Sequence, residues 1–447
     1  MRHPLLTRSA LTLATCLVLS VAATASGGSG GSGSGGSGGG GGATGDAEVP
    51  GEILVKLRST GALQPLLAHQ PVTLIGQFGA RPIYRLRVVG SARVKDVVAA
   101  LALEPDVLIA ESNVTHRSPE ARRTIPWAIG TQAAYTAQWA PSAMRLADAQ
   151  QQATGAGVRV AVLDTGIDLN HPLFAGRLLP GRDFVDGDAD PSEVPGGATG
   201  AYGHGTHVAG LVALAAPGAR ILPLRVLDAD GVGNMWVLGE ALLYAIDPDG
   251  NPATDDGAHV INLSLGSLTR TKILDTIAQI ASCAPATPDD PIGDRSDPGY
   301  ADDERRCANG SVGTVIIAAA GNDSSGSVKE YPAAESAYGL FSVAASDSSQ
   351  RLAKFSNSGT WIDLAGPGDG ITSSIPGGWA TWSGTSMATP LVAGTAALVR
   401  SQDLQLRPRE VLKRLRDGSA PLCGSNIRQV DALTAVNPSA APLAGCK

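Results

Sequence analysis

Apolar runs alternate with helix-like stretches along most of the chain after residue 127. Four mostly apolar runs are predicted to be strands, and they cover residues 158–163, 220–224, 259–263 and 314–319. The runs show no regular polar alternation, which is typical of strands buried on both faces. Buried strands joined by helices predict an α/β domain with a mainly parallel sheet.

A smaller unit with shorter elements precedes this domain, between residues 52 and 113. We predict strands at 53–57, 72–78, 83–89 and 107–110, and helices at 63–67 and 94–101. The order strand, helix, strand, strand, helix, strand is that of a ferredoxin-like α+β unit. Taken alone, such a unit is equally typical of a small binding module.

The N-terminal residues have the pattern of an export signal followed by a spacer. Arg2 and Arg8 precede a mainly apolar stretch that ends in small residues, and we expect cleavage after Ala25. A lipoprotein anchor on Cys16 is the alternative, but Thr15 is a poor residue before such a cysteine. Residues 26–47 are mainly Gly and Ser, which predicts a flexible linker. We therefore expect a secreted protein, with lipid-anchored or cell-surface attachment as the alternative.

Charge and length limit the partners of this chain. The 447 residues carry a formal net charge of −7 without a basic block, which argues against nucleic acid and against anionic membrane surfaces. After the signal, no stretch is long and apolar enough to span a bilayer.

Four cysteines remain after the predicted signal is removed, and an even number in an exported chain suggests disulfides. Three pairings are conceivable. The simplest joins nearest neighbours, Cys283 with Cys307 and Cys423 with Cys446, and the alternative is buried reduced thiols.

Three short motifs and a Gly-Asn pair supply the groups that a serine nucleophile needs. Asp164 ends the first apolar run, His204 opens His-Gly-Thr-His-Val-Ala-Gly, and Ser386 lies in Gly-Thr-Ser-Met-Ala-Thr-Pro. A serine hydroxyl reacts only when a base takes its proton, an acid holds that base and donors stabilise the oxyanion. Asn322 follows a predicted strand and supplies one such donor. Alone, Asp-Thr-Gly and Gly-Asn would suggest ordinary turns.

Two positions along the predicted helices refine this interpretation. Ser386 lies where a helix is predicted to begin, so that unpaired backbone N–H groups face the developing negative charge. His207 is one helical turn beyond His204, and we interpret it as structural because only one base is required.

With these motifs in the order Asp, His, Ser, residues 127–436 resemble the subtilisin-like serine endopeptidases. The resemblance implies a subtilisin-like three-layer α/β/α fold. It assigns charge orientation to Asp164, general-base catalysis to His204, nucleophilic attack to Ser386 and an oxyanion amide to Asn322. It implies a secreted endopeptidase that forms an acyl-enzyme on polypeptides, needs no cofactor for catalysis and acts as a monomer.

The resemblance also implies where a substrate binds. An extended peptide should pair with two glycine-bearing segments, whose residues are Ser264, Leu265, Gly266, Gly231, Val232 and Gly233. Ala319 and Gly321 should wall a wide apolar primary specificity pocket, so we expect broad apolar preference. A cis bond is expected at Tyr331–Pro332.

Residues 48–117 resemble the inhibitory propeptide of these enzymes, which acts as a chaperone and covers the cleft. In this interpretation residues 118–126 are a processing linker, and the cut falls between Asn113 and Trp127. The catalytic domain is then 127–447, with an acidic insertion at 283–307 that we expect to be a surface excursion.

An acidic run before His204 resembles the calcium loop of thermitase-like members of the family. Its candidate ligands are Asp183, Asp186, Asp188, Asp190 and Ser192, which offer hard oxygens. The alternative is a solvated acidic turn. A bound Ca²⁺ would brace the loop that carries His204 and would do no chemistry.

Two other classes of function compete with the endopeptidase. A binding protein could keep the peptide groove without turnover. Loss of one of the four catalytic residues would favour that function, but all four are present in the sequence. An esterase shares the triad but does not explain the propeptide or the strand-pairing segments.

Overall fold

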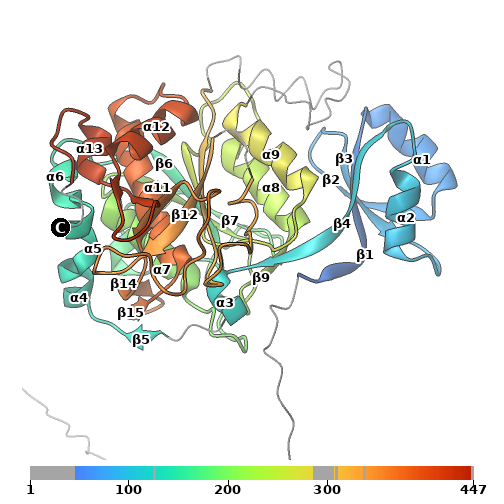
Figure 1. The fold of residues 1–447 in the computed structure, drawn as a ribbon. Coiled ribbons are helices and arrows are strands. Elements are labelled where there is room, and N and C mark those ends of the chain that lie inside the picture. Colours follow the sequence, from blue (N-terminus) through green and yellow to red (C-terminus); the bar gives the residue numbers. More distant parts are fainter. Residues whose placement is uncertain (1–45, 124–126, 285–306, 308–310, 336–338, 444–447) are drawn as a thin grey trace, which may run out of the picture. The chain divides into compact units, whose positions relative to one another are not determined.

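The computed structural model describes residues 46–123, 127–284, 307, 311–335 and 339–443 (Figure 1). The predicted signal, nearly all of the predicted linker, most of the 283–307 insertion and Cys446 lie outside these residues. Within the described part of the chain, no helix has both the length and the apolar character needed to cross a membrane.

A nine-stranded sheet forms the centre of the larger domain, in the order β16-β17-β13-β12-β11-β10-β6-β8-β7. Neighbouring strands are parallel except for the β16–β17 pair. The four predicted strands are confirmed as β6, β8, β10 and β11. The bounds are β6 (Arg159–Asp164), β7 (Arg182–Asp183), β8 (Arg220–Arg225), β10 (Val260–Leu263), β11 (Val315–Ala319), β12 (Leu340–Ser346), β13 (Leu364–Pro367), β16 (Ala420–Pro421) and β17 (Arg428–Gln429).

Helices cover both faces of this sheet, which confirms the three-layer α/β/α architecture (Figure 1). One layer holds α7 (His204–Ala215), α11 (Thr385–Gln402), α12 (Pro408–Gly418) and α13 (Ala432–Val436), and the other holds α8 (Met235–Ile246) and α9 (Lys272–Ser282). Side chains alternate between the two cores: Val160 and Val162 of β6 pack in the first, and Ala161 and Leu163 in the second. Burial on both faces explains why the strands are continuously apolar.

Short elements flank this core on the side of α7. A three-stranded sheet has the order β14-β15-β5, and β15 carries Trp382. The bounds are β5 (Ala128–Ile129), α4 (Gln132–Ala137), α5 (Trp139–Ala143), α6 (Leu146–Gln150), η2 (Pro172–Phe174), β14 (Ile371–Ile375) and β15 (Gly378–Trp382).

The smaller unit has the predicted order of elements. Its bounds are β1 (Glu48–Leu57), η1 (Thr60–Ala62), α1 (Leu63–His69), β2 (Val72–Gln77), β3 (Ile83–Val88), α2 (Val94–Leu101) and β4 (Val107–Arg117). Its sheet, β2-β3-β1-β4, gains a fifth strand, β9 (Val232–Asn234), from the larger domain. Ile53 and Val55 point into the unit's own core, whereas Leu54 packs with α8 and α9. Phe78 stacks on Trp236 of α8, with ring centroids 3.9 Å apart.

The structure differs from prediction on both sides of this unit. The segment predicted as a processing linker, residues 118–126, begins instead as a short helix, α3 (Pro119–Arg123), with Ser118 and Glu120 buried. Asp46, expected in the flexible linker, accepts a hydrogen bond from Thr269 N–H at 2.9 Å. Both segments are ordered by partners far away in the chain, which local composition does not reveal.

One disulfide is described in full. Cys283 and Cys307 are joined with an S–S distance of 2.04 Å, which confirms one of the two nearest-neighbour pairs. Cys423 is also disulfide-bonded. Its predicted partner, Cys446, lies outside the described residues.

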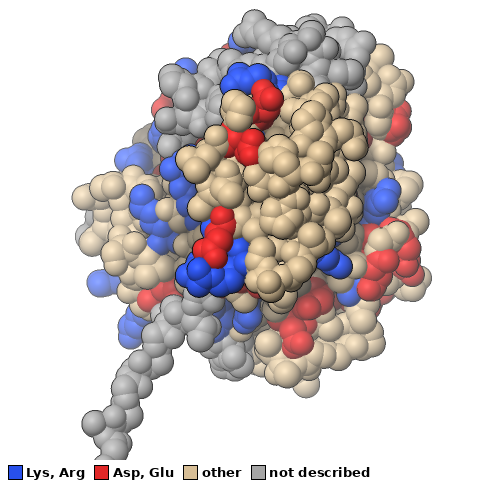
Figure 2. All heavy atoms as spheres, turned by 90° about the vertical axis from the view of Figure 1, so that its right-hand side faces the viewer, with Lys and Arg blue, Asp and Glu red and all other residues tan. Residues whose placement is uncertain are grey.

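Charged side chains are mixed in sign on the face that Figure 2 shows, with no broad basic area. This agrees with the net negative charge of the chain.

Candidate active site

The carboxyl edge of the central sheet carries the predicted catalytic groups. Asp164 is the last residue of β6, Ser264 directly follows β10, and Asn322 lies three residues beyond β11. In a parallel sheet these strand ends meet at one edge, where functional loops gather.

His204 is positioned by the crowded start of α7. Gly203 caps the helix with a φ of 91°, and Gly205 packs so tightly that an added Cβ would lie 2.1 Å from the Gly166 carbonyl oxygen. Glycine is therefore required at both positions. This close approach brings His204 Nδ1 within 2.7 Å of Asp164 Oδ1.

Ser386 is held in the first turn of α11. Pro390, four residues later, has no N–H to donate to the Ser386 carbonyl, and Ser264 Oγ donates to that oxygen instead at 2.9 Å. Thr385 N–H and Oγ1 both donate to Asn322 Oδ1 at 2.9 Å. The Asn322 amide is thereby oriented with its Nδ2 directed toward the site.

Ser386, His204 and Asn322 converge on one carboxylate that was not predicted from the sequence, that of Glu120 in α3. Oε2 of Glu120 accepts a hydrogen bond from Ser386 Oγ at 2.6 Å and lies 3.0 Å from His204 Nε2. Oε1 accepts from Asn322 Nδ2 at 2.8 Å. The sequence does offer a signal, since Glu120 is the only acidic residue between Glu111 and Asp148.

The charges at this point form a buried ion triad. Burial alone would lower the pKa of His204, but the charge of Asp164 and hydrogen bonds to Asp164 and Glu120 raise it to about 10. Burial opposes ionisation of Glu120 as well, yet its hydrogen bonds and its proximity to His204 lower its pKa. The imidazole is therefore protonated at neutral pH and is not free to accept the proton of Ser386.

His207 lies away from these atoms, in line with a structural role. Its Nε2 is 3.2 Å from both the Ile371 and the Ala380 carbonyl oxygens, and burial lowers its pKa to about 3. Trp382 packs edge-on against both His204 and His207, at 5.6 Å and 5.7 Å. A role for Trp382 was not predicted from the sequence.

Glu193 is a second missed residue, and it braces the loop before His204. Its Oε1 accepts from Thr206 N–H at 3.0 Å, and its Oε2 accepts from Gly203 N–H at 3.2 Å. Burial raises the pKa of this carboxyl group.

The two segments predicted to bind substrate hold the chain's own residues. Thr115–Arg117 of β4 pairs antiparallel with Val232–Asn234 of β9. On the other side Arg117 exchanges two hydrogen bonds with Gly266, at 2.8 Å and 2.9 Å. Ser118 N–H donates to the Gly231 carbonyl at 3.1 Å. An extended peptide therefore lies between the two predicted segments.

The predicted walls of the primary pocket lie close together, but what they enclose is not apolar. Ala319 and Gly321 are buried, and the Glu330 carboxylate lies between Gly321 and Gly266. Arg122 Nη1 donates to both Glu330 oxygens, at 2.8 Å and 2.7 Å. An acidic side chain therefore lies where the resemblance implied a wholly apolar pocket. The next bond, Tyr331–Pro332, is cis as predicted.

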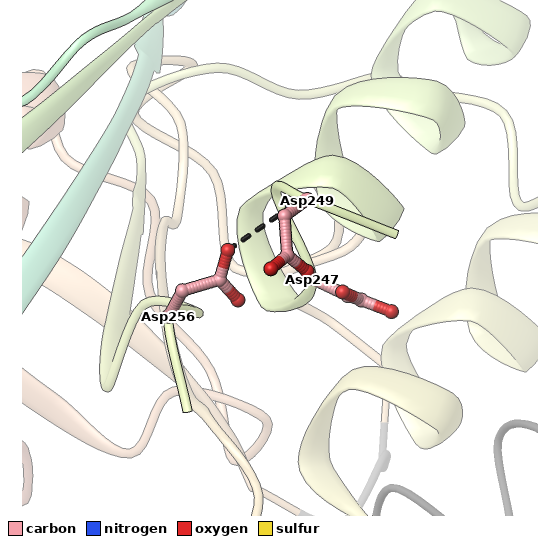
Figure 3. A group of neighbouring side chains, drawn as sticks. All are labelled: Asp247, Asp249 and Asp256. Carbon is pink, nitrogen blue, oxygen red and sulfur yellow. Dashed lines mark hydrogen bonds between the residues drawn. The ribbon is translucent and has the colours of Figure 1, made fainter. Parts of the chain in front are cut away.

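The predicted calcium loop is largely engaged with protein groups. Arg225 Nη1 pairs with Asp183 Oδ2 and, at 2.6 Å, with Asp186 Oδ2. Asp188 and Asp190 accept hydrogen bonds from the loop's own N–H groups. Within the described ranges, the only acidic group whose oxygens gather closely lies elsewhere, after α8, and consists of Asp247, Asp249 and Asp256 (Figure 3). This cluster was not predicted from the sequence.

Comparison with known proteins agrees with this geometry. The profile described as "Subtilase family" matches residues 155–435. "Thermophilic serine proteinase" from Bacillus sp. (strain AK1) is 32% identical over 379 residues, covering 80% of this chain and 79% of the relative. "Thermitase" from Thermoactinomyces vulgaris is 34% identical, over 59% of this chain and 82% of the relative. The fold is shared with fervidolysin from Fervidobacterium pennivorans, a keratinolytic enzyme related to subtilisin, at a TM-score of 0.65 and 20% identity, over 88% of this chain and 61% of that one.

Proposed function

The chain belongs to the subtilase family of serine endopeptidases, and on that basis we propose that it is made as a zymogen and cleaves polypeptides through an acyl-enzyme on Ser386. The observation that carries the proposal is the convergence of Ser386, His204 and Asn322 on one carboxylate of the chain itself. No cofactor is needed for this chemistry.

The proposed reaction begins when Glu120 leaves and a peptide carbonyl takes its place. Neutral His204 then accepts the Ser386 proton at Nε2 while Asp164 holds Nδ1–H, so that Ser386 Oγ attacks the carbonyl carbon. Asn322 Nδ2–H and the Ser386 backbone N–H donate to the resulting oxyanion. His204 passes the proton to the leaving amine, and water releases the acyl group by the same steps in reverse.

The zymogen proposal is supported by what occupies the cleft. Residues 115–118 fill the strand positions of a substrate, but the chain then turns into α3. Ser386 therefore meets a side-chain carboxylate and not a peptide carbonyl. We propose that residues 48–117 form the inhibitory propeptide and that residues 118–126 are cut on activation.

The remaining parts of the proposal rest on the sequence. Residues 1–25 are proposed as the export signal, and the mature enzyme as a secreted monomer acting on polypeptides. A binding protein without turnover is less well supported, since Asp164 and His204 are in bonding contact.

The function is tested with a serine-directed phosphonate on protein freed of its propeptide. We expect one adduct, mapped by mass to Ser386, and loss of peptide hydrolysis in proportion to labelling. The Ser386→Ala variant is the matched control and should not be labelled. A folded, propeptide-free protein that neither reacts nor cleaves any peptide would rule out the enzyme.

A structural Ca²⁺ at residues 183–192 is proposed separately. Exposed Asp186, Asp188 and Asp190 favour it, whereas pairing of Arg225 with Asp183 and Asp186 opposes it, so the donor set fits only in part. If calcium binds, a chelator should lower the melting midpoint by several degrees, because an ion that binds only the folded state stabilises it. An unchanged midpoint would mean that Arg225 alone braces an acidic turn.

A further inference from the structure

Glu330 is a fully buried acid that lies against Gly266 and Gly321. A Cβ at Gly266 would come within 2.6 Å of its Oε1, and one at Gly321 within 2.9 Å of its Oε2. Gly321 directly precedes Asn322, whose amide donates to the same Glu120 carboxylate as Ser386 Oγ does. The carboxylate thus lies inside the pocket that should receive the substrate residue just before the scissile bond.

A guanidinium from the chain itself already occupies this pocket. Arg122 donates from Nη1 to both oxygens of Glu330 and from Nη2 to the Gly266 carbonyl at 3.1 Å. Its side chain is only 5% exposed. Arg122 lies two residues after Glu120, which contacts Ser386, so the pocket and the catalytic centre are filled by one short segment.

Opening the cleft leaves Glu330 without its main partner. A substrate can pair with Gly266 and Gly231 only after residues 115–123 have left, and Arg122 leaves with them. A substrate side chain that fills the opened pocket without bringing a cation would bury this carboxylate unpaired, which is strongly destabilising. Burial raises the pKa of Glu330 to about 7 even with Arg122 present, which shows how poorly the pocket solvates this charge.

We propose that Glu330 makes the mature protease selective for a basic residue, arginine before lysine, immediately before the scissile bond, with Arg122 as the intramolecular stand-in for that residue. The inference rests on the proposed role of Ser386. It replaces the broad apolar preference that the resemblance implied.

The chemistry of the two acceptors explains the order of preference. A guanidinium satisfies Glu330 and the Gly266 carbonyl together, because its donors form a rigid fork. A lysine ammonium neutralises Glu330 but is a point charge and does not reproduce the fork. A leucine or phenylalanine side chain leaves Glu330 buried without a partner, which is the strongest form of discrimination available to a polar pocket.

The test uses four chromogenic tetrapeptides that differ only in the last residue, Arg, Lys, Leu or Phe. We expect kcat/KM for Arg to exceed that for Leu or Phe by about 100-fold or more, with Lys roughly 10-fold below Arg. Active enzyme is counted by phosphonate labelling of Ser386, which does not depend on the pocket.

Glu330→Gln should lose most of the Arg preference, about 100-fold, while labelling of Ser386 persists. Glu335→Gln is the matched control, since Glu335 is also a buried acid but pairs with Arg270 at 2.9 Å. Its Arg preference should be unchanged.

A labelled wild-type enzyme that cleaves the Leu or Phe peptide faster than the Arg peptide overturns the inference and leaves the catalytic proposal intact. Absence of labelling defeats the proposed function itself. If Glu330→Gln does not fold, inhibition by benzamidine is measured on the wild-type enzyme instead. This planar amidinium should compete with the peptide substrate for the pocket. Lack of competition would contradict the pocket assignment.

Discussion

Glu120 shows how much of the site depends on single atoms. Its two oxygens accept hydrogen bonds from Ser386 Oγ, the proposed nucleophile, and from Asn322 Nδ2, the proposed oxyanion donor. The amide that would stabilise an oxyanion therefore also binds a carboxylate, because both present negative oxygen to a fixed donor.

Asn322→Ala tests the proposed oxyanion donor in protein freed of the proposed propeptide. Removing one such donor should lower kcat by about 10²–10³ with little change in KM, because the amide acts on charge that develops only in the transition state. Steady-state kinetics on one peptide checks this. Thr360→Ala, a surface change, serves as the control. An effect confined to KM would contradict the assignment.

Among the elements, α9 depends on the smaller unit for its N-terminus. Its N-cap residue, Thr271, makes no side-chain capping bond. Instead Glu111 of β4 accepts from Lys272 N–H at 2.9 Å and Ile273 N–H at 3.0 Å. A carboxylate here meets both unpaired N–H groups and the positive end of the helix dipole.

Glu111→Gln in a Ser386→Ala precursor should lower the free energy of unfolding by about 1 kcal/mol, because glutamine keeps only one acceptor oxygen for the two N–H groups. Denaturant titration measures it. Glu104→Gln is the control, because Glu104 bonds His69 within the same unit. Equal losses in the two variants would mean that the cap contributes nothing specific.

For the whole molecule, the closed cleft is held by charges whose balance changes with pH. The raised pKa of His204 makes its contribution complete below pH 6.5 and lost as pH rises through about 10. The lowered pKa of Glu120 makes its contribution present above pH 4.5 and lost in stronger acid. The closed precursor should therefore be most stable between these limits and loosen toward alkaline pH.

This pH dependence is measurable by comparing melting midpoints of Ser386→Ala with those of Ser386→Ala/Glu120→Gln. The difference should be largest near pH 5–6.5 and disappear by about pH 10, because the ion pair exists only while His204 is protonated. A difference that stays constant from pH 5 to 10 would show that Glu120 acts through packing alone.

Much of the architecture was predictable because it depends on local pattern. The apolar runs at 158–163 and 314–319 become β6 and β11, since strands buried on both faces need no polar alternation. The ferredoxin-like order of strands and helices in residues 48–117 was also predictable from the hydrophobic pattern. The segment after Arg117 was not, because its helix and its burial depend on contacts with Gly231 and Gly266 that composition does not encode.

The sequence by itself was enough to predict the proposed catalytic set, since Asp164, His204, Ser386 and Asn322 lie in motifs typical of that chemistry. Only the tertiary structure decided which of the chain's own side chains fill the cleft and which acid lines the pocket. Glu120 and Ser386 are 266 positions apart, and Arg122 and Glu330 are 208 apart. A single acidic or basic residue forms no pattern with its sequence neighbours. Such residues pair when the fold buries them together, because a buried charge without a partner is strongly destabilising.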